Sequence, residues 1–255
     1  MTIYDNTDEH NDVEFHNTIM FNGNMSCGYS GVLTGRYSAI KFYDDIYRNF
    51  DLPQLSVLMW IYPIRISIVA NKKQTLFHFS SKRYKYGNYT FVLNENYQPI
   101  LSYSNEVLTV TATSTDPIKY DEWHHIAAVY SQVNETILFY INGQPIPLQQ
   151  TRSAVGMSPS ATSEPTSQEG FQGFGNDDKL STPFSGVIDE IYVFKCPVLP
   201  DMITNVANTC NRREGHTCPS PIHGICPDKL PFELDEQTPA PIESQPVSTP
   251  LNTSP

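Results

Sequence analysis

The chain lacks the long apolar runs and the leader that mark a membrane-inserted protein. A membrane-spanning helix needs about 20 consecutive, predominantly apolar residues. The longest apolar stretch, LSVLMWIYPI at 55–64, is much shorter and contains Pro63. The polar and acidic beginning, MTIYDNTDEHNDVEFHN, has neither the basic start nor the apolar centre of a signal peptide. No membrane insertion is therefore predicted for this segment, and its first residues taken alone indicate the cytosol.

Basic residues and the common catalytic motifs are also scarce. The chain has 16 Lys and Arg against 27 Asp and Glu, a formal net charge of −11. A nucleic-acid-binding domain is expected to carry a basic footprint, so no nucleic-acid partner is predicted. The sequence contains no G-x-S-x-G, no H-E-x-x-H and no phosphate-binding glycine loop. These absences argue against a hydrolase.

Aromatic residues are plentiful, although only 2 of them are Trp against 15 Tyr and 13 Phe. This bias favours β-strands. Apolar runs of strand length follow one another, mostly bounded by Gly, Asn, Asp or Pro, and only 200–210 suggests a short helix. The sequence therefore predicts an all-β sandwich. The predicted strands are 38–43, 55–62, 75–80, 89–93, 99–103, 107–113, 122–130, 136–141 and 186–194.

The segment 120–146 predicts a β-meander. Asn142-Gly143 separates two apolar runs, and this pair supplies the positive φ that both central residues of a type I′ turn require. The strands 122–130, 136–141 and 144–148 should therefore lie side by side, with Gly143 as a structural residue of the turn.

Two adjacent histidines in this meander raise the question of a metal site. Alternate strand residues share a face, so Trp123, His125, Ala127 and Val129 should form a core face and His124 should point away. A metal needs several convergent ligands, and these two imidazoles cannot supply them jointly. His125 is predicted to be a buried neutral imidazole with a hydrogen-bond partner, and Trp60 and Trp123 are predicted to belong to the structural core.

Composition divides the chain into four parts, the second of which contains a loop insert. Residues 1–14 read as a disordered lead-in, and 15–205 as one sandwich domain. Within it, 149–170 is rich in small and polar residues and reads as a mobile loop. A short Cys-containing segment follows at 206–228, and 229–255 has the Pro, Ser and Thr content of a stalk or linker.

Sequons, cysteines and the stalk indicate an extracellular or cell-surface location for a glycoprotein. N-x-[ST] sequons mark candidate glycosylation sites. They begin at Asn24, Asn88, Asn134 and Asn252. The expected location implies a leader that is missing here or lies upstream. A cytosolic protein with chance sequons is the alternative.

The five cysteines allow two readings. In an extracellular setting they predict disulfides, with Cys196 pairing into the 210–226 segment. Five is odd, so one thiol stays free or pairs outside the chain, and Cys27 is either that thiol or a partner of a tail cysteine. Alternatively, Cys210, Cys218 and Cys226, with His216 and His223 between them, offer zinc ligands, although the usual C-x-x-C pair is absent.

Three blocks of sequence resemble a known family. EWHHIAAVYSQVNETILFYINGQPI resembles the W-x-H-[VI]-A-x-x-Y…N-G segment of laminin-G-like and pentraxin-like jelly-roll domains. FSGVIDEIYVFKCPVLPDMI is similar to their closing F-x-G-x-[IL]-D-E motif, and GRYSAIKFYDD with LSVLMWIYP is similar to their opening strands. The resemblance covers about residues 31–203 and implies an antiparallel jelly-roll sandwich of the concanavalin A-like lectin and glucanase superfamily.

The resemblance implies a non-enzymatic recognition or adhesion module that binds glycan or protein ligands at its loop rim. It also implies calcium as a candidate cofactor, because such domains often bind it through carboxylates and carbonyls. One candidate is Asp189, with carbonyls from the N-terminal region. The other is the loop Asn176, Asp177 and Asp178, for which a solvated acidic turn beside Lys179 is the alternative.

Two other functions remain open at this point. A retaining glycosidase of this fold needs two carboxyl groups about 5 Å apart. Asp189 and Glu190 are neighbours expected to face opposite sides, whereas Glu233 and Asp235 have the right spacing but lie in the stalk. No catalytic residue is therefore predicted, and the protein is expected not to be an enzyme. A structural spacer without a ligand is the third possibility.

Overall fold

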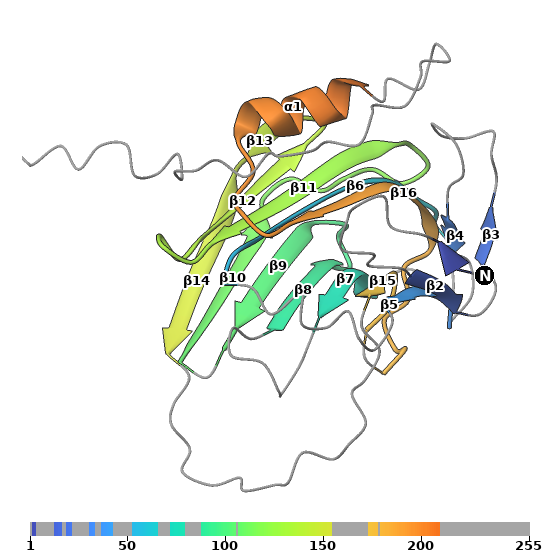
Figure 1. Ribbon diagram of the computed structural model, residues 1–255, viewed down its shortest axis with the longest axis horizontal. Helices are drawn as coiled ribbons and strands as arrows, with labels where there is room; N and C mark the ends of the chain where they lie inside the picture. Colours follow the sequence, from blue (N-terminus) through green and yellow to red (C-terminus); the bar gives the residue numbers. More distant parts are fainter. Residues whose placement is uncertain are drawn as a thin grey trace, which may run out of the picture.

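Two antiparallel β-sheets pack face to face in the computed structural model (Figure 1). The prediction of an all-β antiparallel sandwich is confirmed. The structure describes the residues 2–3, 13–16, 19–21, 31–33, 37–42, 53–65, 72–79, 88–105, 107–154, 173–177 and 179–209.

Sheet A has nine strands and sheet B has seven. In spatial order, sheet A consists of β1 (Thr2–Ile3), β2 (Val13–His16), β5 (Ala39–Phe42), β15 (Gly173–Phe174), β7 (Gln74–Phe79), β8 (Asn88–Leu93), β9 (Pro99–Ser104), β10 (Leu108–Ser114) and β14 (Leu148–Ala154). Sheet B consists of β13 (Gln144–Ile146), β12 (Thr136–Ile141), β11 (His124–Ser131), β6 (Leu55–Pro63), β16 (Gly186–Phe194), β4 (Gly31–Leu33) and β3 (Ile19–Phe21). The strands predicted from the sequence are all present, with ends that shift by one or two residues.

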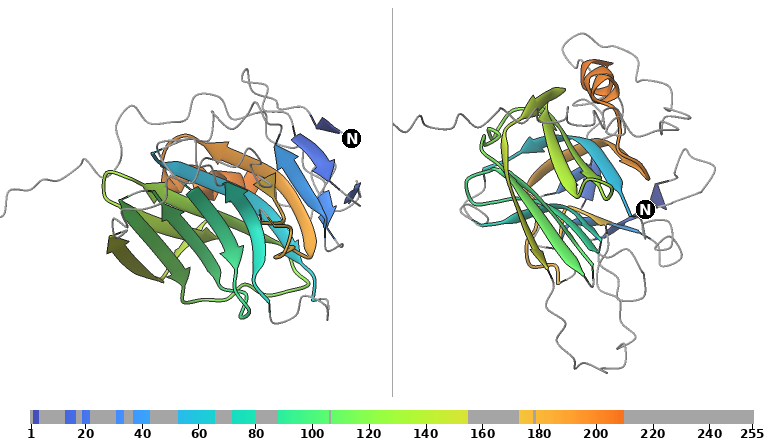
Figure 2. Two further views of the ribbon diagram at one scale, coloured as in Figure 1. Left: turned by 90° about the horizontal axis from the view of Figure 1, so that it is seen from below. Right: turned by 90° about the vertical axis from the view of Figure 1, so that its left-hand side faces the viewer.

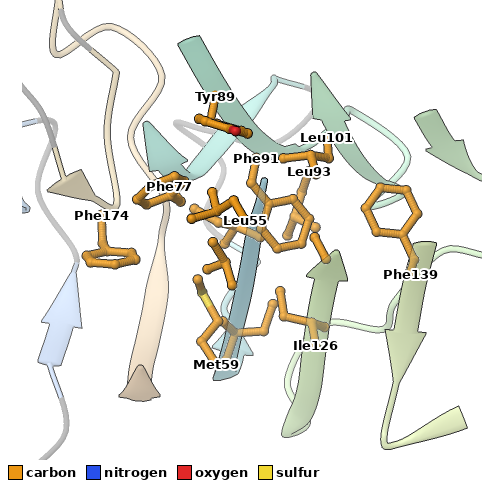
Figure 3. Close-up of a cluster of buried hydrophobic side chains, with 14 of the residues drawn as sticks. Leu55, Met59, Phe77, Tyr89, Phe91, Leu93, Leu101, Ile126, Phe139 and Phe174 are labelled. Atoms are coloured by element: carbon orange, nitrogen blue, oxygen red, sulfur yellow. The ribbon is translucent and has the colours of Figure 1, made fainter. Parts of the chain in front are cut away.

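The core lies between the sheets and is rich in aromatic rings (Figure 3). Alternate residues of each strand point inward, as a period of two requires. Phe91 of β8 stacks on Phe139 of β12 with ring centroids 5.9 Å apart, and Tyr103 of β9 stacks on Tyr130 of β11 at 4.2 Å. Because each pair joins one sheet to the other, these rings fix how the two sheets face each other.

A helix, α1 (Pro200–Thr209), covers the outer face of sheet B. The right-hand view of Figure 2 shows it outside the sandwich. Pro200 suits the first turn of a helix, where no backbone donor is needed, and Asp201 favours the positive end of the helix dipole. Ile203 and Val206 then pack against sheet B, in a second apolar cluster with Leu58, Ala127, Val129 and Tyr140. The short helix expected at 200–210 is thereby confirmed.

This helix corrects one expectation about β11. Ala127 and Val129 were predicted to face the core of the sandwich, but they lie beneath α1. The opposite face of the strand, with Ile126, Ala128 and Tyr130, enters the sandwich core. Both faces of β11 are apolar, so the sequence pattern alone did not distinguish the face under the helix from the face between the sheets.

The turn after β12 has the predicted backbone. Asn142 and Gly143 adopt φ of 52° and 76°, as a type I′ turn requires. The turn is tied to β11, because Asn142 N donates to His125 O at 2.7 Å. It also touches α1, where Thr204 Oγ1 donates to Gly143 O at 2.9 Å. A β-carbon at Gly143 would lie 3.0 Å from Thr204 Cα, so the helix packs directly on the glycine.

The strands also extend into segments expected to be irregular. Residues 149–154, predicted as the start of a mobile loop, instead form most of β14. β14 pairs with β10 along its whole length, and Gln150 and Arg152 also bond to the turn between β11 and β12, contacts that the polar sequence QQTRSA does not reveal. β1 lies within the segment 1–14, which was expected as a lead-in. Residues 155–170 and 210–255 lie outside the described part of the chain. None of the described helices is long and apolar enough to cross a membrane.

Candidate functional site

Three connections meet at one end of the sandwich and form what we call the rim: residues 64–65, 94–98 and 115–123. Ile118 N donates to Tyr97 O at 2.9 Å and joins the last two of these connections. Asp121 N donates to Pro63 O at 2.7 Å and joins the third connection to the end of β6. The rim is therefore a set of loops that hold one another in place.

A cluster of exposed Arg65 and Tyr120 with half-buried Tyr97 lies on this rim, and we call it the tyrosine–arginine cluster. Arg65 Nη1 donates to Tyr120 Oη at 2.9 Å. The guanidinium carbon lies 5.1 Å from the centroid of the Tyr120 ring, within the range of a cation–π contact. Tyr97 adds a second ring, 5.9 Å from Tyr120 between centroids. Tyr120 is 42% exposed, so the cluster presents aromatic surface and guanidinium donors to solvent.

The backbone of the rim is strained at two positions. Tyr97 and Asp121 adopt φ of 60° and 61°, which is uncommon for residues other than glycine and unusual for a bulky aromatic residue. Such conformations cost about 1–3 kcal/mol each, and they gather at ligand sites. Asn94 supports the strained loop, because its Oδ1 accepts hydrogen bonds from Asn96 N and Gln98 N, each at 2.9 Å. The loop is thus fixed before any ligand arrives.

Charges of both signs surround the cluster. Lys119 pairs with Glu122 at 3.3 Å, and Asp116 and Asp121 are exposed nearby. His124 lies beneath them, with Nε2 3.0 Å from Lys119 O, and burial lowers its pKa despite that hydrogen bond and the carboxylate of Glu122. The imidazole is therefore neutral at physiological pH. This mixed field does not select strongly for a charged ligand.

The two histidines of β11 are separated, as alternation along a strand requires. His125 is fully buried and packs edge-on against Trp60, with ring centroids 5.5 Å apart. Trp123 is half-buried and forms a similar edge contact with Tyr62. His124 turns to the carbonyl of Lys119 instead. The pair therefore forms no joint metal site.

The calcium candidate Asp189 lies on the outer face of sheet B. It is in register with Trp60, which is in turn in register with His125. Its Oδ1 accepts a hydrogen bond from Glu190 N at 2.9 Å. Calcium takes six to eight oxygen ligands, and the side chains of Trp60 and His125 contain no oxygen. The N-terminal carbonyls expected to complete this site lie largely outside the described residues, so calcium at Asp189 stays a prediction.

The second calcium candidate is occupied with its own loop. Asp177 accepts hydrogen bonds from Ser181 N at 2.5 Å and from Ser181 Oγ at 2.6 Å. Partial burial alone would raise the pKa of Asp177, but hydrogen bonds from Ser181 and Thr182 outweigh it and the pKa is lowered. Asn176 is buried and accepts from Asp177 N, whereas Asp178 lies outside the described residues. Nowhere in the described ranges do three His, Cys, Asp or Glu side chains gather, and calcium binding stays a prediction.

A β-bulge also changes the expected geometry of the neighbouring carboxylates. The register of β16 against β6 shifts between Asp189 and Tyr192, and Glu190 adopts a φ of 49°. Strict alternation, on which opposite faces for Asp189 and Glu190 were predicted, therefore does not hold at this point. Glu190 Oε2 instead accepts a hydrogen bond from Tyr192 Oη at 2.8 Å.

Few of the remaining predicted sites fall on described residues. Asn88 begins β8, and Asn134 lies in the turn between β11 and β12; both are half-buried. Cys196 is buried and disulfide-bonded, but it is the sole cysteine in the described ranges. The partners of Cys196 and the zinc alternative therefore stay predictions. The predicted glycosylation and disulfide residues that lie outside the described ranges are Asn24, Asn252, Cys27, Cys210, Cys218 and Cys226.

The tyrosine–arginine cluster was not predicted from the sequence. Arg65 and Tyr120 are 55 positions apart, so no local motif contains both. A weaker sign was available, since Tyr97 in NENYQP and Tyr120 in DPIKYDEW interrupt polar, turn-forming stretches. Large aromatic residues in such loops are candidates for exposed contact surfaces.

A family model matches most of the sandwich. The model described as the concanavalin A-like lectin/glucanases superfamily covers residues 34–204, which is 171 of the 255 residues. No curated protein sequence matches the chain.

Solved structures share the fold at low identity. The binding domain of botulinum neurotoxin DC, in complex with rat synaptotagmin II, has a TM-score of 0.52 and 15% identity, over 80% of this chain and 48% of that chain. A botulinum neurotoxin type C structure, described as dependent on two ganglioside molecules for cell entry, has a TM-score of 0.52 and 14% identity over the same shares. A heptameric SAP-like pentraxin from Limulus polyphemus has a TM-score of 0.40 and 16% identity, over 61% and 70%. The chain spans about half the length of the two toxin chains, and the likeness shows the fold alone.

Proposed function

This chain belongs to the concanavalin A-like lectin/glucanases superfamily, and from that premise we propose that it is a non-enzymatic recognition module of an extracellular or cell-surface protein. Its ligand is a glycan, bound at the rim through the tyrosine–arginine cluster. A protein surface presented at the same rim is the second candidate.

The exposed pairing of Tyr120 with Arg65 is the observation that carries this proposal. Tyr and Arg are the side chains enriched in energetically dominant contacts. An aromatic face packs against the apolar face of a sugar ring, while guanidinium donors bond to its hydroxyl groups. The two strained residues and the bonded loops favour binding without a large ordering cost. The mixed charges around the cluster favour a neutral glycan over a polyanionic one.

The relatives add limited support for both ligand classes. Cell entry of one toxin depends on ganglioside molecules, and the other toxin's binding domain forms a complex with the protein synaptotagmin II. Both ligands belong to those proteins. They make a glycan or a protein a reasonable class of ligand to test for this chain.

The proposal that the protein is not an enzyme rests on the carboxylates of Asp189 and Glu190. Glycoside hydrolysis uses two carboxyl groups that flank one sugar bond. Glu190 Oε2 accepts a hydrogen bond from Tyr192 Oη, and Asp189 Oδ1 accepts one from Glu190 N, so both carboxylates make contacts within β16 itself. Turnover of any member of a polysaccharide panel, with calcium present, would overturn this part of the proposal.

The direct test is a glycan array read with the full chain and two variants, Tyr120→Ala and Arg65→Ala. Removal of a central contact of this kind costs about 2 kcal/mol or more, which is roughly a 30-fold loss of affinity. Tyr37→Ala is the matched control, because Tyr37 is also exposed, at 49%. Tyr37 precedes β5, and β15 and β7 lie between β5 and β8, the strand that leads into the rim. Equal binding by Tyr120→Ala and Tyr37→Ala would exclude the cluster. A blank array together with a blank cell-surface pull-down would favour a spacer without a ligand.

A further inference from the structure

Among the described strands, β14 forms one edge of sheet A. It pairs with β10 over its whole length, from Leu108 opposite Ala154 to Ser114 opposite Leu148, without a register shift. β14 is the last strand in the order of sheet A, and no described strand pairs with its other side. Every second residue of this seven-residue strand therefore presents its backbone donor and acceptor outward.

The other sheet ends are less able to accept a further strand. β13 closes sheet B with only three residues, one of which is Pro145. β1 and β3, at the opposite ends of the two sheets, have two and three residues. Short edges and proline are devices by which proteins block unwanted strand pairing. β14 has neither device, and it contains no glycine, lysine or bulge.

The one charge on β14 is directed away from the open edge. Arg152 Nη2 donates to Asn134 O at 3.0 Å, and its Nη1 lies 3.4 Å from Glu135 Oε2. Gln150 makes two more bonds to the same turn of sheet B, donating to Glu135 O and accepting from Ile137 N, each at 2.9 Å. These contacts connect β14 to sheet B. They also pair the charge of Arg152, which would otherwise oppose the addition of another strand at this edge.

We propose that β14 pairs antiparallel with β14 of a second copy of the chain, about a twofold axis that passes midway between Thr151 and the partner's Thr151. In this register Thr151 faces the partner's Thr151, Gln149 faces the partner's Ser153, and Gln150 faces the partner's Arg152. No two like charges oppose each other, and the hydroxyl and amide side chains can bond across the seam. Self-complementarity is what a twofold interface requires.

A second copy fits this edge better than a foreign peptide does. Strand addition by a foreign peptide gains its specificity from pockets that take alternate side chains. Here the exposed side chains Gln149, Thr151 and Ser153 are polar and leave such a peptide little to pack against. A seam of one short strand is a small interface, so the dimer forms reversibly, with a dissociation constant on the order of micromolar.

Sedimentation of the full chain tests the proposal across about 1 to about 500 µM. The average mass should rise toward twice the monomer value with concentration. Thr151→Lys should stay monomeric, because it places two like charges across the axis. Thr113→Lys, on the same face of the interior strand β10, should associate as the unsubstituted chain does. A constant monomer mass in the unsubstituted chain, or an equal response of the two variants, would overturn the proposal.

A cysteine at the axis gives an independent measurement. Opposed residues in an antiparallel pair have Cα atoms about 4.5–5.5 Å apart, which suits a disulfide. Thr151→Cys should therefore give a covalent dimer on mild oxidation. Thr113→Cys and the unsubstituted chain, with its five cysteines, measure the background. A dimer yield for Thr151→Cys no higher than that background would contradict the register.

Discussion

The substitution Ile203→Ala tests whether α1 is an integral part of the domain. Ile203 is fully buried between the helix and the outer face of sheet B, in the cluster with Leu58 and Tyr140. The change removes three carbon atoms, which is about 2.4 kcal/mol of lost burial at roughly 0.8 kcal/mol per carbon. The cavity left behind adds to this, so we expect the free energy of unfolding to fall by about 2–5 kcal/mol.

Urea unfolding followed by circular dichroism and tyrosine fluorescence measures this loss. For a chain of this size, each 1 kcal/mol corresponds to roughly 2–4 °C in the melting temperature. Val133→Ala is the control, because Val133 is also β-branched but is 65% exposed in a turn, and its substitution should change stability by less than about 0.5 kcal/mol. The reasoning fails if the two variants are equally stable. It also fails if Ile203→Ala loses the helix signal alone while the sheets unfold unchanged.

Four further outcomes are expected. Gly143→Ala should destabilise the protein by at least about 1–2 kcal/mol in the same unfolding assay, because φ is positive and the β-carbon would press on α1; unchanged stability would contradict this. Because burial holds the pKa of His124 below its unfolded value of 6.5, the folded state binds fewer protons, so stability should fall as the pH drops below about 6.5. His124→Gln should flatten that dependence, and a slope that does not differ from that of the unsubstituted chain would exclude His124 as its source. If calcium is structural, EDTA should lower the melting temperature, whereas an unchanged value would remove the Asp189 proposal. When the chain is secreted behind a supplied leader, endoglycosidase treatment should lower its mass, and the absence of a mass shift would count against the proposed extracellular location.

The sequence predicted the sandwich well because its strands carry local information. The pair Asn142-Gly143 determines its own turn, and the apolar runs around it determine their own strands. The face of β11 was assigned wrongly because Ala127 and Val129 are as apolar as the residues on the other side. Only the docking of α1 decides which of two apolar faces meets the opposite sheet.

The tyrosine–arginine cluster on the rim could not be predicted from the sequence for a different reason. Arg65 and Tyr120 meet only because β6 and β11 are neighbours in sheet B and the loops beyond them converge. Likewise, β14 pairs with β10 and is tied by Gln150 and Arg152 to a turn of the other sheet. Contacts of this kind depend on the finished fold, so a local pattern does not reveal them.

The burial of β11 on both sides has a consequence for how this domain can change over time. Every residue from His124 to Ser131 is buried, and those from Ile126 to Tyr130 are each confined by the sandwich core or by the apolar cluster under α1. Substitutions there should be poorly tolerated, whatever the ligand. The exposed residues of the rim carry no such burden, and loops of this kind accept new side chains readily. If the rim binds the ligand as proposed, substitutions at Tyr120 and its surroundings can change the ligand without loss of stability, whereas substitutions in β11 cannot.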